Sequence, residues 1–229
     1  MTQDADSPPT IAYDGYNLEV VENFTYLGST ISSLLYIDTE VNGRIAKAAA
    51  AMARLSQRVW NNPNLTEKTR LRVYQSCVLS TLLYRSEAWT TYTSYERKLN
   101  SFHLRCLRHI LRIQWQDKVP KTEVLECASM NSMFTILSER RLRWLGHVKR
   151  MDPGRIPKDL LYGELAEDTR LTGRPHLRYK DVCKKDMKMA NIIVNNWESC
   201  ADDRSAWRHA VRQGIQKAEE RKNTNLATK

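Results

Sequence analysis

The sequence predicts a mainly α-helical protein that begins with a small β-hairpin segment. Apolar residues recur three or four positions apart in several long stretches after residue 43, which is the spacing of amphipathic helices. Residues 11–32 differ, because short β-favouring runs surround the pair Asp14-Gly15, a common two-residue hairpin turn. We expect two or three short strands there, with Gly28 as a bend. No apolar run in the 229-residue chain approaches the ~20 residues that span a bilayer.

Capping and breaking residues divide the rest of the chain into a multi-helix array. Thr66 is placed to cap one helix, and Thr93 and Glu96 have the spacing of a capping box that opens the next. The charged residues 217–229 are expected to fray. The predicted helices cover residues 44–60, 66–91, 93–113, 120–127, 133–151 and 179–193, with a last helix from about residue 204.

Charge is distributed unevenly along the chain, whose net charge is +10. No Lys or Arg precedes Arg44, whereas seven acidic residues do: Asp4, Asp6, Asp14, Glu19, Glu22, Asp38 and Glu40. The remainder holds all 36 basic residues against 19 acidic ones, a net +17. This asymmetry predicts a polyanionic partner. Nucleic acid is the commonest such partner, and an anionic membrane surface is the alternative.

The cysteines and the first residues indicate an intracellular protein, nuclear or cytoplasmic. The five cysteines are odd in number and widely spaced, so they do not have the pattern of a disulfide framework. A reducing compartment fits this usage. Residues 1–10 are polar and acidic, which indicates a disordered leader rather than a secretory signal.

The densest group of cations lies in residues 140–158, RRLRWLGHVKRMDPGRIPK. Seven cations face one acid, Asp152, and the helix would end at Pro153 and Gly154. Trp144, Leu145, Val148 and Met151 share one helical face, which could hold the basic helix on the core. We interpret the stretch as a surface for a phosphate backbone. An ordinary solvated charged face is the alternative.

Residue patterns for catalysis or metal binding are weak. The sequence has no nucleotide-binding glycine loop and no strand with paired aspartates. We interpret Asp202-Asp203 as an N-cap with a first-turn acid. Cys106 and His109 form only half of a zinc-type pattern, so we expect no metal and no cofactor.

The six tryptophans fall about once per predicted helix, which is typical of core anchors. Trp115 is the exception, because it lies between Gln114 and Gln116 in a predicted loop. An aromatic side chain in such a position could stack on a base. We therefore include Trp115 among the candidate nucleic-acid contacts.

Several stretches together resemble a known family. They are FTYLGSTIS, CVLSTLLYRSEAWTTY, LNSFHLRCLRHILRIQWQDKV, RRLRWLGHVKRM, LLYGEL, GRPHLRYKDVCKKDMK and DDRSAWRHAV, in this order from Phe24 to Val211. They resemble the C-terminal part of non-LTR (LINE-type) retrotransposon endonuclease–reverse transcriptases. One departure is Arg85, which stands where such sequences have glycine.

The resemblance implies a domain layout. Residues 11–43 would be a remnant of the polymerase palm, 44–120 a helical thumb-like domain and 121–216 a basic helical C-terminal region, between the leader 1–10 and the charged tail 217–229. The palm motif that carries the catalytic aspartates has no counterpart in this chain. The chain alone is therefore not expected to be an active enzyme.

Composition and resemblance together predict a nucleic-acid-binding fragment of an RNA-directed DNA polymerase. Its partner would be RNA or DNA, as a template–primer duplex or the element's own RNA, and the missing polymerase domain is a further candidate partner. The alternative is a structural or protein-interaction remnant whose acidic N-terminus pairs with its basic body. The candidate nucleic-acid contacts are Arg140, Arg141, Arg143, Lys149, Arg150, Arg155, Lys158, Arg174, Arg178, Lys180 and Trp115.

Overall fold

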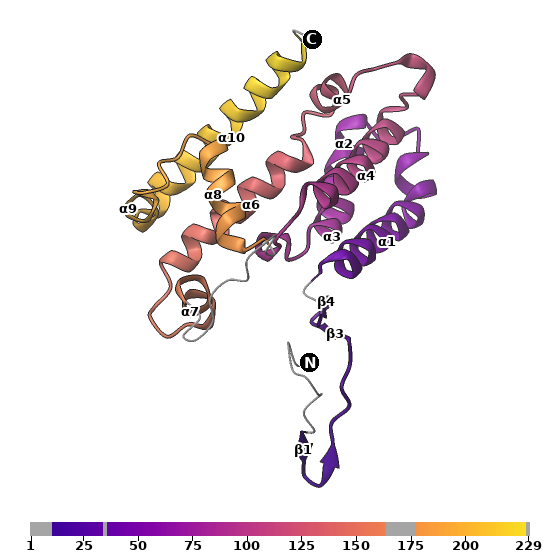
Figure 1. Ribbon diagram of the computed structural model, residues 1–229. Helices are drawn as coiled ribbons and strands as arrows, with labels where there is room; N and C mark the ends of the chain where they lie inside the picture. The colour runs from indigo at the N-terminus through magenta and orange to yellow at the C-terminus, as the bar shows by residue number, and fades with distance from the viewer. Residues whose placement is uncertain (1–10, 34–35, 164–176, 228–229) are drawn as a thin grey trace. The chain divides into compact units, whose positions relative to one another are not determined.

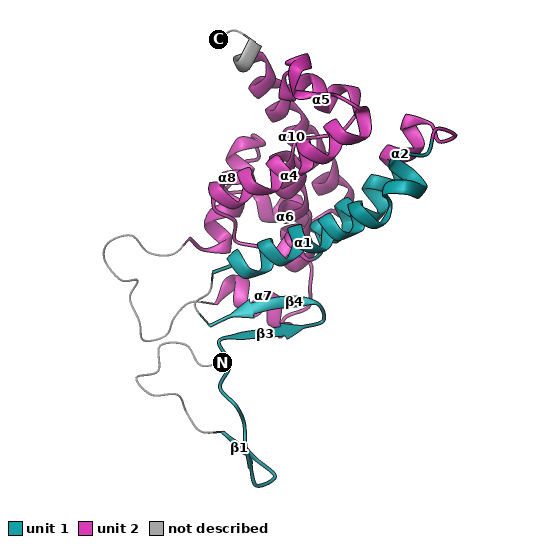
Figure 2. Ribbon diagram, turned by 90° about the vertical axis from the view of Figure 1, so that its right-hand side faces the viewer, with its two compact units in different colours: residues 1–62, 72–84 teal, residues 63–71, 85–229 magenta. Residues whose placement is uncertain are grey.

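The computed structural model describes residues 11–33, 36–163 and 177–227 (Figure 1). In this part of the chain two short antiparallel hairpins precede ten α-helices, which confirms the predicted fold class. The chain divides into two compact units: unit 1 comprises residues 1–62 and 72–84, and unit 2 comprises residues 63–71 and 85–229 (Figure 2). Within the described residues, no helix combines the length and apolarity needed to cross a bilayer.

The first hairpin forms at the predicted Asp14-Gly15 turn. Strands β1 (Ala12–Tyr13) and β2 (Tyr16–Asn17) pair antiparallel, and Tyr13 lies opposite Tyr16. Asp14 and Gly15 have φ values of 50° and 80°. Positive φ at both central positions is what a type I′ turn requires, and this turn matches the twist of the two strands.

The second hairpin forms a separate two-stranded sheet, so four strands replace the two or three predicted. Strand β3 (Asn23–Tyr26) pairs antiparallel with β4 (Ser29–Ser32). Leu27 and Gly28 turn the chain with φ values of 47° and 80°. Gly28 tolerates this conformation, whereas the Cβ atom of a leucine crowds the backbone there.

A buried ion pair attaches the second hairpin to helix α1 (Asp38–Arg54) inside unit 1. Arg44 Nε donates to Glu40 Oε1 at 2.7 Å, and both side chains are buried. The other oxygen of Glu40 accepts the Thr30 N–H at 2.7 Å, while Arg44 donates to the Gly28 carbonyl. The Arg44 guanidinium also lies 4.5 Å from the ring centroid of Tyr84. Helix α1 begins at Asp38, before the predicted start at residue 44, and its first turns hold the hairpin.

Unit 1 is completed by helical segments that pack on α1. They are the π-helices η1 (Ser56–Trp60) and η2 (Tyr74–Leu79) and the short helix α3 (Ser80–Leu82). The Trp60 indole N–H donates to the Met52 carbonyl at 2.7 Å, so this tryptophan is a core anchor as predicted. The buried apolar residues of unit 1 are Val41, Ala48, Val59, Trp60, Tyr74, Val78, Leu82 and Leu83.

The helix predicted over residues 66–91 is shorter and interrupted. The Thr66 hydroxyl accepts the Thr69 N–H at 3.2 Å, which confirms the predicted cap of α2 (Glu67–Val73). The helical path then ends at Leu82 rather than near Thr91. Arg85 has φ 58°, in the left-handed region, which interrupts a right-handed helix.

Unit 2 is an array of helices in which α6 is central. Its elements are the 3-10 turns η3 (Ser86–Ala88) and η4 (Trp115–Asp117) and the helices α4 (Thr93–Leu111), α5 (Lys121–Cys127), α6 (Met133–Lys149), α7 (Ile156–Tyr162), α8 (Tyr179–Met189), α9 (Trp197–Asp202) and α10 (Arg204–Ala227). Helix α6 contacts η3, α4, α7, α8, α9 and α10. The predicted helices 133–151 and 179–193 are confirmed, although α8 ends earlier because Asn191 adopts φ 55°.

The closest packing in this core joins α6 to α10. Trp207 is fully buried, and its indole N–H donates to the Leu142 carbonyl at 2.8 Å. A Cβ atom added at Gly146 would lie 2.2 Å from the indole nitrogen of Trp207. The absence of a side chain at Gly146 therefore makes the space that the indole occupies.

Helix α10 continues through the segment that was expected to fray. Asp203 Oδ1 accepts the backbone N–H groups of Ser205 and Ala206 at 2.7 and 3.2 Å, which confirms the N-cap predicted at the Asp202-Asp203 pair. Ala218 is buried, and Glu219 Oε1 accepts the Ser132 N–H at 2.8 Å. These contacts hold the helix on unit 2, and it reaches Ala227.

Replacing Gly146 with alanine should destabilise unit 2 by about 1–3 kcal/mol, because the new methyl group would displace a tightly packed indole. Chemical denaturation followed by circular dichroism measures the change. Gly43→Ala is the matched control, since Gly43 lies within α1 and no atom lies within 4 Å of its added Cβ. The control should be neutral or stabilise by up to ~1 kcal/mol. Equal stability of the two variants would contradict the packing argument.

Acid should weaken the fold through His103 of α4. Burial lowers the pKa of His103 from 6.5 to about 4, although a backbone hydrogen bond at Asn131 acts in the opposite direction. As the pH falls from 6.5 to 4, the unfolded imidazole binds a proton and the folded one does not. The free energy of unfolding should therefore fall by up to about 3 kcal/mol over this range.

Denaturant titrations at several pH values between 7 and 4 measure this loss. His103→Gln should flatten the dependence, because it removes the group that protonates only on unfolding. His109→Gln is the matched control for the substitution itself, because His109 is an exposed histidine on the same helix. A His103→Gln profile as steep as that of the wild type would assign the acid sensitivity to carboxylates instead.

Candidate nucleic-acid interface

The structure removes Arg141 from the set of candidate surface contacts. Its side chain is 1 % exposed and lies inside unit 2. Arg141 Nε donates to Asp186 Oδ2 at 2.7 Å, and Nη2 lies 3.1 Å from Glu96 Oε1. The expectation that Arg141 contacts phosphate is therefore wrong, because its guanidinium is enclosed and paired. The density of cations in residues 140–158, not helical position, grouped Arg141 with the surface contacts, whereas its spacing of four and seven residues from Leu145 and Val148 places it on their buried face.

The partners of Arg141 join three helices. Glu96 belongs to α4, Arg141 to α6 and Asp186 to α8. Two hydroxyl groups complete the cluster: Thr91 donates to Glu96 at 2.8 Å, and Ser138 donates to Asp186 at 2.9 Å. Glu96 is thus committed to this buried cluster, and the capping-box role predicted for it is not observed.

Electrostatics in this cluster favour the charged guanidinium. Burial opposes the charged form, but attraction by Asp186 and Glu96 outweighs this effect and raises the pKa of Arg141. Nearby, burial raises the pKa of the Cys183 thiol to about 12 and also raises the pKa of the Tyr179 phenol. The Tyr179 hydroxyl remains protonated and can donate to the Glu87 or the Arg141 carbonyl, at 3.0 and 3.2 Å. The cluster is therefore a structural connection between helices.

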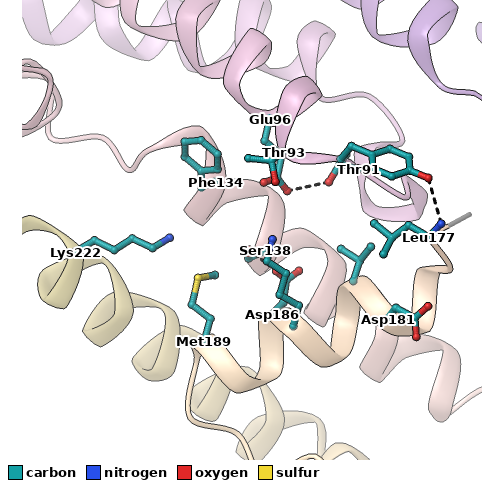
Figure 3. Close-up of a pocket in the computed structure, with 13 residues that line it drawn as sticks. Thr91, Thr93, Glu96, Phe134, Ser138, Leu177, Asp181, Asp186, Met189 and Lys222 are labelled. Atoms are coloured by element: carbon teal, nitrogen blue, oxygen red, sulfur yellow. Dashed lines mark hydrogen bonds between the residues drawn. The ribbon is translucent and has the colours of Figure 1, made fainter. Parts of the chain in front are cut away.

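A cavity of about 320 Å³ opens beside this cluster (Figure 3). Its described lining comes from the segments before α4 and α8 and from α4, α6, α8 and α10, and Lys222 points into it from α10 (Figure 3). The Ser138 hydroxyl is already donated to Asp186, and none of the described lining residues is a histidine or cysteine that could activate a nucleophile. We find no catalytic arrangement in this described lining.

The remaining predicted cations differ in how far their charge is neutralised. Arg140 lies 3.5 Å from the Glu87 carboxylate, and Lys149 lies 3.4 Å from Asp202 and 4.0 Å from Glu198. These two cations therefore have carboxylate partners. They contribute less net positive potential at the surface than the number of cations in residues 140–158 suggested.

Two other cations bond to neutral carbonyls and keep their charge. Arg150 donates to the Ala201 carbonyl, and Lys158 donates to the Met151 carbonyl at 2.6 Å. The Lys180 ammonium lies 5.7 Å from the Tyr162 ring centroid. These contacts also show that the end of α6, helix α7 and the start of α8 are neighbours.

Three predicted cations are exposed, and in the described part of the chain they have no carboxylate within salt-bridge distance: Arg143, Arg155 and Arg178. Together with Arg150, Lys158 and Lys180 they define what we call the basic corner. Arg143 lies in α6 and Arg150 is the residue that caps its C-terminus, and their spacing of seven residues places them on the same side of the helix. Arg174 lies outside the described residues.

Sequence reasoning did not select a row of cations on α10. Arg204, Arg208 and Arg212 are exposed and four residues apart, so they lie along one face of this helix. The four-residue spacing was a readable signal. Lys184 and Lys188, which belong to the basic helix predicted over residues 179–193, are also exposed and four residues apart on α8.

Trp115 is exposed, as its predicted loop position required, at 82 % of its full surface. It lies in the 3-10 turn η4, between α4 and α5. The Gln114 N–H donates to Asp117 Oδ2 at 2.7 Å and closes this turn. Whether Trp115 contacts nucleic acid stays a prediction.

Cys106 and His109, which form half of a zinc-type pattern, have different surroundings. Cys106 is buried, which raises the pKa of its thiol to about 12, whereas His109 is exposed. Among the described residues, no three His, Cys, Asp or Glu side chains are grouped so that they could hold a metal ion.

Comparison with known proteins gives one informative similarity. The chain is 24 % identical over 204 residues to a Caenorhabditis elegans protein described as an uncharacterized transposon-derived protein, and the match covers 86 % of this chain and 72 % of that protein. This similarity supports a transposon origin. No protein family in the comparison matches the chain, and no solved structure matches it.

Replacing Arg141 with methionine should destabilise unit 2 by about 3–5 kcal/mol, because Asp186 and Glu96 would remain buried without a counter-charge. Thermal and urea denaturation measure the loss. Arg143→Met is the matched control: it makes the same change two residues away at an exposed position and should alter stability by less than ~0.5 kcal/mol. Similar stability of the two variants would show that the ion pairs do not hold the helices together.

Proposed function

We propose that this chain is a nucleic-acid-binding fragment of a LINE-type reverse transcriptase, comprising thumb-like and basic C-terminal parts. The observation that carries the proposal is the net charge of +17 after residue 43. Exposed cations of the basic corner that have no carboxylate partner support it, as does the similarity to a transposon-derived protein. The partner would be a template–primer duplex or the element's RNA.

Binding in this proposal is mainly electrostatic. Cations that replace condensed counterions on the phosphates release them, so affinity falls as the salt concentration rises. Contacts of this kind read no base edges and give little sequence selectivity. Within the basic corner, Arg143, Arg155 and Arg178 are the best phosphate contacts, because their side chains are exposed and are not used to hold a carbonyl.

Catalysis is not part of this proposal. The sequence has no paired-aspartate strand motif, and nucleotidyl transfer by two metal ions needs such carboxylates. The chain would therefore supply binding, and a polymerase domain would supply the chemistry.

The exposed apolar side chains of the hairpins favour a second role for unit 1, contact with a protein partner. Such side chains are unusually frequent in this segment. They are Ile11, Tyr13, Tyr16, Leu18, Val20, Phe24, Tyr26, Leu27, Ile31 and Tyr36. A polymerase domain is the partner that we infer for this surface.

A salt titration tests the basic corner. The double variant Arg143→Gln, Arg155→Gln should flatten the slope of log K against log salt by up to about 1.8 for duplex DNA, since each phosphate contact contributes about 0.9. The matched control is Arg140→Gln, Lys149→Gln, which removes the same net charge from cations that have carboxylate partners. Its slope should stay close to that of the wild type.

The measurement is fluorescence anisotropy with labelled duplex and single-stranded RNA and DNA, and a thermal melt verifies that each variant is folded. An equal flattening in both double variants would show that only total charge matters. An unchanged slope in both would move the surface elsewhere, with α8 and α10 as the next candidates. No binding by the wild type at low salt would favour the structural or protein-interaction alternative.

A further inference from the structure

Trp115 is the most exposed large hydrophobic side chain among the described residues. A tryptophan normally stabilises a fold by burying its large apolar surface. Trp60, Trp89 and Trp207 do so in this chain, and Trp144 and Trp197 are half-buried. The indole of Trp115 adds little to the folded core, so its position calls for another physical role.

The backbone around Trp115 is fixed by several hydrogen bonds. The Ile113 N–H donates to the Arg108 carbonyl at 2.9 Å, which ends α4, and Arg108 Nη2 donates to the Val119 carbonyl at 3.2 Å. The Asp117 carboxylate closes the turn between them. The indole therefore projects from a constrained support, and stacking on it costs little loss of backbone freedom.

The two cations that flank Trp115 occupy strained backbone positions. Arg112 ends α4 with φ 57°, and Lys118 follows η4 with φ 51°. Glycine is the usual residue at such left-handed positions, because other side chains crowd the backbone there. Both side chains are exposed. A cation at a position that favours glycine therefore indicates that its positive charge has a role outside the fold, such as contact with an anionic ligand.

The charge around the turn has one sign. Residues 105–121 contain five cations and one acid, Asp117, whose carboxylate caps the turn. Arg105, Arg108 and Arg112 are spaced so that they share one face of α4, which leads to Trp115. An exposed aromatic ring beside a row of cations has the two components, stacking and phosphate contact, by which proteins bind single-stranded nucleic acid.

We propose that Trp115 stacks on an unpaired base of single-stranded RNA or DNA, while Arg112 and Lys118 contact the phosphates on either side. This inference rests on the proposed function and names the strand form recognised at this turn. The bases inside a duplex are already stacked on their neighbours, so the indole can reach only a single strand or an open end. Phosphate contacts at the basic corner carry no such restriction.

The test compares two probes. One is a single-stranded oligonucleotide. The other is a dumbbell duplex, whose two ends are closed by short loops so that no unpaired base or open end is accessible to the indole. Trp115→Ala should weaken single-strand binding about 5- to 100-fold and leave dumbbell binding unchanged. Trp115→Phe, which keeps an aromatic face, should restore most of the affinity. Leu160→Ala is the matched control, because Leu160 is a similarly exposed apolar residue on α7, and it should change neither affinity.

A second variant separates the ligand contact from fold stability. Arg112→Gly should raise the melting temperature, because glycine suits φ 57°, and it should nevertheless weaken single-strand binding. A structural role for Arg112 would move both quantities in the same direction. Single-stranded probe should also quench tryptophan emission in the wild type, and less so in Trp115→Phe.

The outcomes distinguish this inference from the proposed function. If Trp115→Ala binds single strands as tightly as the wild type, while Arg143→Gln, Arg155→Gln still flattens the salt slope, the stacking platform is wrong and the proposed function stands. Equal loss on both probes would also overturn the platform. If the wild type binds neither probe, both fail, and a change in self-association in Trp115→Ala would identify the turn as a protein contact.

Discussion

The arrangement of unit 2 depends on the ion pairs of one buried residue, Arg141. A guanidinium in a protein interior is tolerated only when carboxylates and further hydrogen bonds replace its water. Asp186 and Glu96 supply those carboxylates, with Thr91 and Ser138 completing the hydrogen bonds. Because each partner comes from a different element, satisfying this one charge fixes α4 and α8 against α6. The tight fit of Trp207 against Gly146 fixes α10 against the same helix.

The cations of residues 140–158 are equivalent in the sequence but not in the structure. Arg141 is enclosed, Arg140 and Lys149 have carboxylate partners, and Arg150 and Lys158 bond to carbonyls. The carbonyl contacts leave the positive charge available to a polyanion, and Arg143 and Arg155 are exposed without a carboxylate partner in the described part of the chain. The proposed nucleic-acid surface therefore uses fewer cations of this stretch than the seven that the sequence offers, and it includes Arg178 and Lys180 at the start of α8.

Left-handed backbone positions occupied by large residues recur in this chain. Arg85, Arg112 and Lys118 have φ values of 58°, 57° and 51°. Arg85 stands where the sequences that this chain resembles have glycine. The positive φ at this position explains the preference for glycine, because only glycine adopts this conformation without steric cost. At Arg112 and Lys118 the same cost accompanies two exposed cations beside an exposed tryptophan, which is the basis of the inferred stacking platform.

The sequence by itself determined the features that depend on neighbouring residues. Apolar periodicity located the helices, Asp14-Gly15 gave the first hairpin, and Thr66 and Asp203 gave caps, because each depends on contacts within a few positions. Only the tertiary structure decided which cations remain available. Glu96 and Asp186 lie 45 positions before and after Arg141, so local pattern could not reveal that they enclose it. The continuation of α10 through residues 217–227 was decided in the same way, by the contact between Glu219 and distant Ser132.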